Sequence, residues 1–152
     1  MLAVNIFESD EVEGLLTVDC ERLEEYAFEV LAKSGIAAGE YNIVFIGDAY
    51  MTELNRLYKD RQGTTDVLSF SLEDVPHDFS EGVSGEVYVS LERAGKQASE
   101  LAVPFDEEVV RLVTHGLLHI AGRAHDTDEE YASMVQDTDK LVESFFTAGS
   151  EQ

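Results

Sequence analysis

Residues 109–125 read VVRLVTHGLLHIAGRAH and contain three of the four histidines in the 152-residue chain. The stretch is apolar on most sides, which predicts a central, buried helix rather than a helix on the surface. Gly122 is expected to end this helix, because glycine adopts the left-handed backbone conformation without a steric penalty. The other elements are therefore expected to pack around this helix.

The rest of the chain shows strand and helix patterns in the order β-α-β-α-β-β-α-α-α. The expected strands are residues 2–9, 41–46, 66–72 and 85–90, and the expected helices are residues 18–33, 49–59, 91–101, 105–121 and 128–146. This order predicts an α+β fold, in which helices pack against a small mixed four-stranded sheet. The length and the 44% hydrophobic content predict one domain, residues 1–152.

Local signals predict the ends and buried faces of several helices. The buried face of the first helix is expected to consist of Leu23, Tyr26, Ala27, Val30 and Leu31. Asp48 is expected to cap the second helix. The apolar face of that helix is expected to consist of Leu54, Leu57 and Tyr58. Thr127 and Glu130 form a T-x-x-E capping box for the last helix. Three acids that complement the helix dipole stand in the first turn of helix 105–121: Asp106, Glu107 and Glu108.

The charge balance is strongly acidic, with 10 basic and 32 acidic residues and a formal net charge of −22. This balance excludes RNA binding through bulk electrostatics, so RNA contact requires a local basic patch or a bound metal. No segment approaches the roughly 20 apolar residues of a membrane helix, and the N-terminus lacks the basic region of a signal peptide. Cys20, the only cysteine, is expected to be a buried residue that packs in the core rather than a metal ligand. These features predict a cytoplasmic protein.

The histidine spacing predicts a metal site. His115 and His119 lie at i and i+4, on one face of a helix, so their imidazoles can converge on one ion. If the chain turns back at Gly122, His125 can supply a third ligand. Three histidines with a water in the fourth position are typical of a catalytic zinc site, and zinc lowers the pKa of such a water to about 7. One zinc ion fits best, although iron, cobalt, nickel and copper also accept imidazole. His77, in a polar loop, is expected to be solvated.

Gly116 distinguishes this site from a protease site. In the H-E-x-x-H helix of zinc hydrolases, a glutamate after the first histidine is the general base, and Gly116 occupies its position here. The spacing H-x3-H-x2-G-x2-H is that of the metzincin metalloproteases without their glutamate. It more closely resembles the YbeY endoribonuclease family, whose helix reads approximately H-G-x-L-H-L-x-G-Y-D-H.

Two further motifs extend this resemblance over about residues 40–145. Residues 54–70, LNRLYKDRQGTTDVLSF, are similar to the family's L-N-x-x-Y-R-x-x-D-x-P-T-D-V-L-S-F, and residues 85–90, GEVYVS, are similar to its G-D-I-x-I-S. The resemblance implies a zinc-dependent, single-strand-specific endoribonuclease that matures the 3′ end of small-subunit (16S) rRNA and acts in ribosome quality control. It also implies a zincin-like metal helix, single-stranded RNA as substrate, and the ribosomal small subunit and its assembly factors as partners.

The resemblance assigns roles to particular residues. His115, His119 and His125 would hold the metal. Lys59 stands where the family has arginine and is a candidate phosphate contact, with Arg61 as a second candidate. For both residues, solvated loop charge is the alternative.

Other positions depart from the family pattern or have an open role. Thr64 replaces the family's proline, and residues 123–124, Arg-Ala, replace its Y-D. Asp66 is expected to cap a turn or to orient a ligand histidine, and Asp126 to act as a base or to be an exposed acid. The attacking group remains open between a metal-activated water and the 2′-hydroxyl of the RNA. Two alternative functions also remain: a metalloprotease, and a non-catalytic ribosome-assembly factor with a structural metal.

Overall fold

The computed structural model describes residues 1–57, 67–71, 83–122 and 127–150. Its elements, in chain order, are β1 (Leu2–Glu8), the 3₁₀ helix η1 (Asp10–Val12), α1 (Cys20–Lys33), β2 (Gly39–Ile46), α2 (Asp48–Leu57), β3 (Val67–Ser71), β4 (Gly85–Ser90), α3 (Leu91–Leu101), α4 (Phe105–Ile120) and α5 (Asp128–Ser150). The predicted order of strands and helices is confirmed, with η1 as an addition.

The four strands form one mixed sheet in the order β1-β2-β4-β3. β1, β2 and β4 run parallel, and β3 pairs with β4 in the antiparallel direction at one edge. In the parallel part, Ile43 of β2 lies opposite Ile6 of β1 and Val87 of β4. The predicted α+β class and mixed sheet are confirmed.

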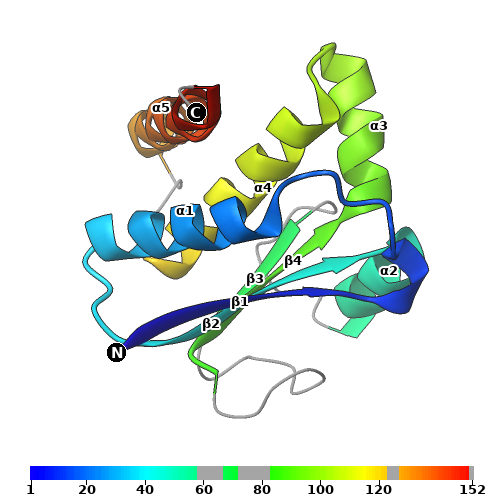
Figure 1. Ribbon diagram of the computed structural model, residues 1–152, viewed down its shortest axis with the longest axis horizontal. Coiled ribbons are helices and arrows are strands. Elements are labelled where there is room, and N and C mark those ends of the chain that lie inside the picture. Colours follow the sequence, from blue (N-terminus) through cyan, green and yellow to red (C-terminus); the bar gives the residue numbers. More distant parts are fainter. Residues whose placement is uncertain (58–66, 72–82, 123–126, 151–152) are drawn as a thin grey trace.

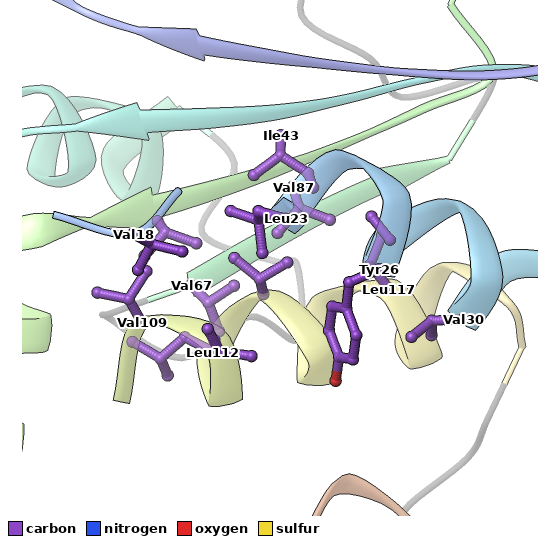
Figure 2. Packing of buried hydrophobic residues seen from close by; sticks show 14 of the residues in the cluster. Val18, Leu23, Tyr26, Val30, Ile43, Val67, Val87, Val109, Leu112 and Leu117 are labelled. Atoms are coloured by element: carbon purple, nitrogen blue, oxygen red, sulfur yellow. The ribbon is translucent and has the colours of Figure 1, made fainter. Parts of the chain in front are cut away.

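The two faces of the sheet are covered by different helices (Figure 1). Successive strand residues point to opposite faces, so the apolar strands β2 and β4 supply two cores. The larger core, under α1 and α4, contains the strand residues Ile43, Phe45, Val67, Val87 and Val89. The smaller core, on the face of α2, contains Val44, Ile46, Leu68 and Tyr88. Figure 2 shows how side chains of α1 and α4 meet those of the strands in the larger core.

Helix α4 is the most enclosed helix of the described chain. It contacts α1, α3, α5, β3 and β4. Nine of its 16 residues are buried, which explains why the sequence of this segment is apolar on most sides. The long apolar helix predicted over residues 105–121 is therefore confirmed, and its contacts with β3 and β4 hold it against the sheet.

Side chains cap two further helices. Ser90 accepts a hydrogen bond from the Arg93 amide at 3.3 Å and so caps α3. The capping box of α5 is present, because the Glu130 amide donates to Thr127 Oγ1 at 3.1 Å and the Thr127 amide donates to Glu130 Oε1 at 3.2 Å. The buried face of α1 consists of the five predicted residues. These features depend on neighbours within a few positions along the chain.

Some predictions for the helices were wrong. Asp48 is the first residue of α2 rather than a residue preceding it, and its carboxylate pairs with Arg93. Leu57 is 56% exposed, and the buried residues of α2 are instead Met51 and Leu54. Tyr58 lies outside the described residues. Helix α5 continues beyond the predicted end at residue 146. None of the helices in the described ranges has the length and apolar character that a membrane crossing requires.

Candidate active site

The predicted histidine pair lies on one side of α4. His115 and His119 are both half-buried, and their imidazole rings lie nearly parallel, at 8°, with centroids 6.5 Å apart. This arrangement follows from the helical repeat, which places residues four apart on one face. Two neighbouring imidazoles are part of the donor set that zinc accepts, so the described portion of the site fits the predicted metal.

The backbone turns immediately after the second histidine, as predicted. The Gly122 amide donates to the His119 carbonyl at 3.0 Å, and Gly122 has a φ of +93°. A side chain at this φ would be strained, which accounts for the glycine. Helix α4 therefore ends at Ile120, five positions before residue 125.

The third predicted ligand, His125, lies outside the described residues. Within the described ranges, no group of three His, Cys, Asp or Glu side chains could hold a metal ion. A complete three-histidine site therefore requires a donor from outside those ranges, and His125 stays the predicted one. The other predictions that fall outside the described residues concern Lys59, Arg61, Thr64, Asp66, His77, Arg123, Ala124 and Asp126.

Gly116 faces the sheet rather than the histidine pair. A Cβ atom at this position would lie 2.5 Å from Val87 Cγ1 and 3.2 Å from Ser69 Oγ. Since real Cβ atoms do not approach carbon this closely, the glycine is what allows α4 to pack tightly on β3 and β4. A glutamate here would enter the core. The sequence indicated only a missing base, and the structure supplies a packing reason for its absence.

The fold brings two of the sequence motifs together. β3, which belongs to the TDVLSF motif, packs against α4, which carries the histidines. The Ser69 hydroxyl donates to the Gly116 carbonyl at 3.3 Å, across 47 positions in the sequence. Part of the TDVLSF motif and the histidine helix therefore lie in direct contact.

A buried charged network precedes His115 on α4. The Glu108 carboxylate is fully buried, accepts a hydrogen bond from Gln97 Nε2 at 2.6 Å and lies 3.7 Å from Arg111 Nε. Burial lowers the pKa of Arg111, but hydrogen bonding to Asp139 and the nearby carboxylates outweigh this and raise it. A permanent positive charge therefore stands one helical turn before His115. Its i−4 spacing from the first histidine is the sequence signal that could have identified it.

Tyr26 of α1 forms a hydrogen bond with α4 at Thr114, the residue before His115. Its hydroxyl and Thr114 Oγ1 share a hydrogen bond of 2.6 Å, and Thr114 also donates to the Val110 carbonyl at 2.7 Å. Tyr26 is only 8% exposed. Burial raises the pKa of Tyr26 to about 12, against smaller opposing effects of Thr114 and the Arg111 charge.

This pKa predicts a loss of stability at high pH. The folded state favours the neutral phenol of Tyr26. Its contribution to the free energy of unfolding is therefore fully present below pH 10.0 and is lost as the pH rises towards about 12. A shift of this size corresponds to about 2–3 kcal/mol. We expect the free energy of unfolding, measured by urea denaturation across this range, to fall more steeply for the wild type than for Tyr26→Phe. Tyr131→Phe, at a tyrosine that is 55% exposed, should follow the wild type, and equal slopes for all three proteins would contradict the assignment.

Cys20 differs from its predicted environment. It is the first residue of α1 and is half-buried rather than part of the core. Its pKa is raised, first by partial burial and then by the charges of Glu8, Asp19 and Glu24. The thiol is therefore held in its protonated form, unlike the activated thiolates at some helix N-termini.

The chain matches the family described as Endoribonuclease YbeY over residues 8–146, which is most of its length. The chain belongs to the YbeY endoribonuclease family. This confirms the family resemblance predicted from the sequence, and the matched range includes the histidine helix and the two upstream motifs.

Individual relatives agree with this assignment. A Persephonella marina protein named Endoribonuclease YbeY is 34% identical over 113 residues, which cover 74% of each chain. A Bacillus cereus protein of the same name is 32% identical over 148 residues, covering 92% of this chain and 93% of the relative. A Thermotoga maritima protein with a known solution structure matches with a TM-score of 0.64 and 26% identity, over 97% of this chain and 92% of the other. The YbeY family resemblance and the fold class predicted from the sequence are thus both supported.

Proposed function

We propose that the protein is a zinc-dependent endoribonuclease that cleaves single-stranded RNA. One arrangement carries the proposal: in a chain of the YbeY family, His115 and His119 stand parallel on one side of α4 while Gly116 between them packs against the sheet. The pair provides two imidazole donors, and Gly116 supplies no carboxylate at the general-base position of the zinc proteases. In the cell, this activity would serve maturation of the 3′ end of small-subunit 16S rRNA and ribosome quality control.

Different residues of the chain would bind the metal and the RNA. His115, His119 and His125 would hold one zinc ion. When bound, zinc would supply Lewis-acid stabilisation of the negative charge that develops on the phosphate during cleavage. Lys59 or Arg61 would contact the phosphate and orient the RNA. Arg111, one turn before His115, forms ion pairs with Glu107, Glu108 and Asp139 and would hold α4 and α5 together beside the site.

The binding partners follow from the same proposal. Single-stranded RNA is the substrate, and the ribosomal small subunit with its assembly factors would recruit the protein in the cytoplasm. The net charge of −22 opposes binding to RNA at long range. Recruitment by a protein or ribosomal surface, followed by local contacts at the metal, suits this charge better than capture of free RNA.

A metalloprotease is disfavoured by the packing of Gly116. A general-base glutamate at this position would have to occupy space taken by Val87 and Ser69. A purely structural metal is disfavoured by the half-buried state of both histidines, since structural zinc sites are closed by four protein ligands.

Metal analysis followed by an RNA cleavage assay tests the proposal. We expect the purified protein to contain zinc and to cleave single-stranded RNA but not a duplex of the same sequence. Chelation should abolish cleavage, and added zinc should restore it, at both low and high salt. Cleavage that is indifferent to the chelator, or a metal-loaded protein without cleavage, would overturn the proposal.

A further inference from the structure

A cavity beside His115 is not explained by the metal site. It has a volume of about 290 Å³ and lies between β3, α3, α4 and α5. Its lining includes the buried apolar residues Val67, Leu112 and Met134, next to the hydrogen-bonded pair Gln97 and Glu108. Ligand pockets for drug-sized molecules have volumes of roughly 300–1,000 Å³, so this cavity has room for one small planar group rather than for a length of chain.

Two exposed apolar residues mark the mouth of this cavity. Tyr131 and Val135 both line it and lie one helical turn apart on α5, and they are 55% and 39% exposed. An exposed tyrosine at the mouth of an apolar cavity offers a flat face for stacking. In the recognition of single-stranded RNA, unstacked bases commonly pack on aromatic side chains in this way.

A buried polar group in the cavity wall supplies a second observation. Thr138 is 5% exposed and lines the cavity, and its hydroxyl oxygen is buried without a hydrogen-bond partner among the described residues. Buried hydroxyls are usually hydrogen-bonded, so one without a partner in a cavity wall requires an explanation. A ligand with a polar edge and an apolar face would supply the missing partner.

We propose that this cavity is a subsite for a single base of the RNA substrate, adjacent to the position of the scissile phosphate. The inference rests on the proposed endoribonuclease function. The base stacks on Tyr131 at the mouth and enters over Leu112 and Met134. Its polar edge meets the Thr138 hydroxyl, which can donate or accept and so tolerates different bases. His115 lines the same cavity, so a nucleotide bound there would have its phosphate near the metal ligands.

The charge of the protein makes such a subsite useful. With a net charge of −22, affinity for RNA cannot come from many phosphate contacts. Stacking and burial of a base depend little on the charge of the surface. A base subsite would therefore contribute affinity where electrostatics do not, and it would favour single strands, whose bases are free to leave the stack.

Binding of cleavage-resistant RNA tests this proposal separately from cleavage. The probes are short 2′-O-methyl, phosphorothioate-linked single strands, either intact or abasic at one position, and gel electrophoresis verifies that they stay uncut during the measurement. The readout is the dissociation constant of the metal-loaded protein from fluorescence anisotropy. We expect an abasic residue at the position beside the scissile phosphate to weaken binding by roughly ten-fold. Tyr131→Ala should weaken binding of the intact strand by a similar factor and remove the difference between the two strands.

Variants of matched chemistry complete the test. Tyr131→Phe keeps the stacking face and should bind as the wild type does. Phe28→Ala removes an aromatic residue that is 44% exposed on α1 and should change nothing. Thr138→Val is nearly isosteric, so it should weaken binding by about three- to ten-fold without lowering the Tm. Equal affinity of the wild type for intact and abasic strands would overturn the subsite even if cleavage is metal-dependent, and Thr138→Val with unchanged affinity would overturn the role of the hydroxyl.

Discussion

Substitution of Gly116 by glutamate is expected to prevent stable folding rather than to create a protease. The new side chain would start 2.5 Å from Val87 Cγ1, at a buried position where α4 packs on β3 and β4. Overpacking alone costs about 1–3 kcal/mol, and an unpaired buried carboxylate adds several kcal/mol. The sum is a large fraction of the stability of a typical domain, which is about 5–15 kcal/mol.

The smaller change Gly116→Ala isolates the steric part. Alanine in a helix interior is favoured over glycine by about 1 kcal/mol, so a helix with free space should become more stable. Gly95 of α3 provides the matched control, because a Cβ there would meet Phe105 at an ordinary 3.7 Å. We expect Gly95→Ala to be neutral or stabilising and Gly116→Ala to destabilise by about 1–2 kcal/mol in urea unfolding.

A double variant checks the cause. Val87→Ala removes the methyl groups that a Cβ at position 116 would meet, so Gly116→Ala should cost less in a Val87→Ala background than in the wild type. Additive costs, or equal effects of alanine at positions 95 and 116, would show that the close approach of α4 to β4 does not limit this position.

Replacement of either histidine of the α4 pair is expected to have the largest effect on activity. Loss of residues that merely support a metal ligand typically costs 10–100-fold, so His115→Ala or His119→Ala should lower the rate of RNA cleavage by at least about 100-fold. Both side chains are half-buried, and neither belongs to the apolar cores. The far-UV circular dichroism spectrum should therefore stay that of the wild type.

The metal content shows whether a lower cleavage rate results from the loss of a zinc ligand or from another cause. Zinc per chain, measured by mass spectrometry of the elements, should fall in both variants together with the rate. His125→Ala should behave in the same way if the third ligand is the predicted one, whereas His77→Ala, at the remaining histidine, should keep both zinc and activity. A variant at position 115 or 119 that cleaves RNA at the wild-type rate would contradict the assignment of the pair.

The sequence by itself was sufficient wherever a feature depends on residues within a turn or two of each other. The buried face of α1, the capping box of Thr127 and Glu130, the turn at Gly122 and the shared side of His115 and His119 were all predicted correctly. Each arises from the helical repeat or from backbone groups that a near neighbour satisfies. The family could be assigned for the same reason, because its histidine motif is one local stretch.

Tertiary structure decided which of these residues are enclosed and by what. The sequence shows only that Gly116 replaces a general base, whereas in the fold this glycine packs against Val87. The sequence shows Glu108 only as an acid in the first turn of a helix, whereas in the fold its carboxylate is buried and accepts a hydrogen bond from Gln97. Leu57 fits a helical apolar face and is nevertheless 56% exposed. The cavity at His115 depends on α5, whose Tyr131 and Thr138 follow the histidine helix in the chain and were not among the predicted site residues. Burial and close packing depend on residues that are distant in sequence. A local sequence pattern does not show which distant element will pack against a given residue.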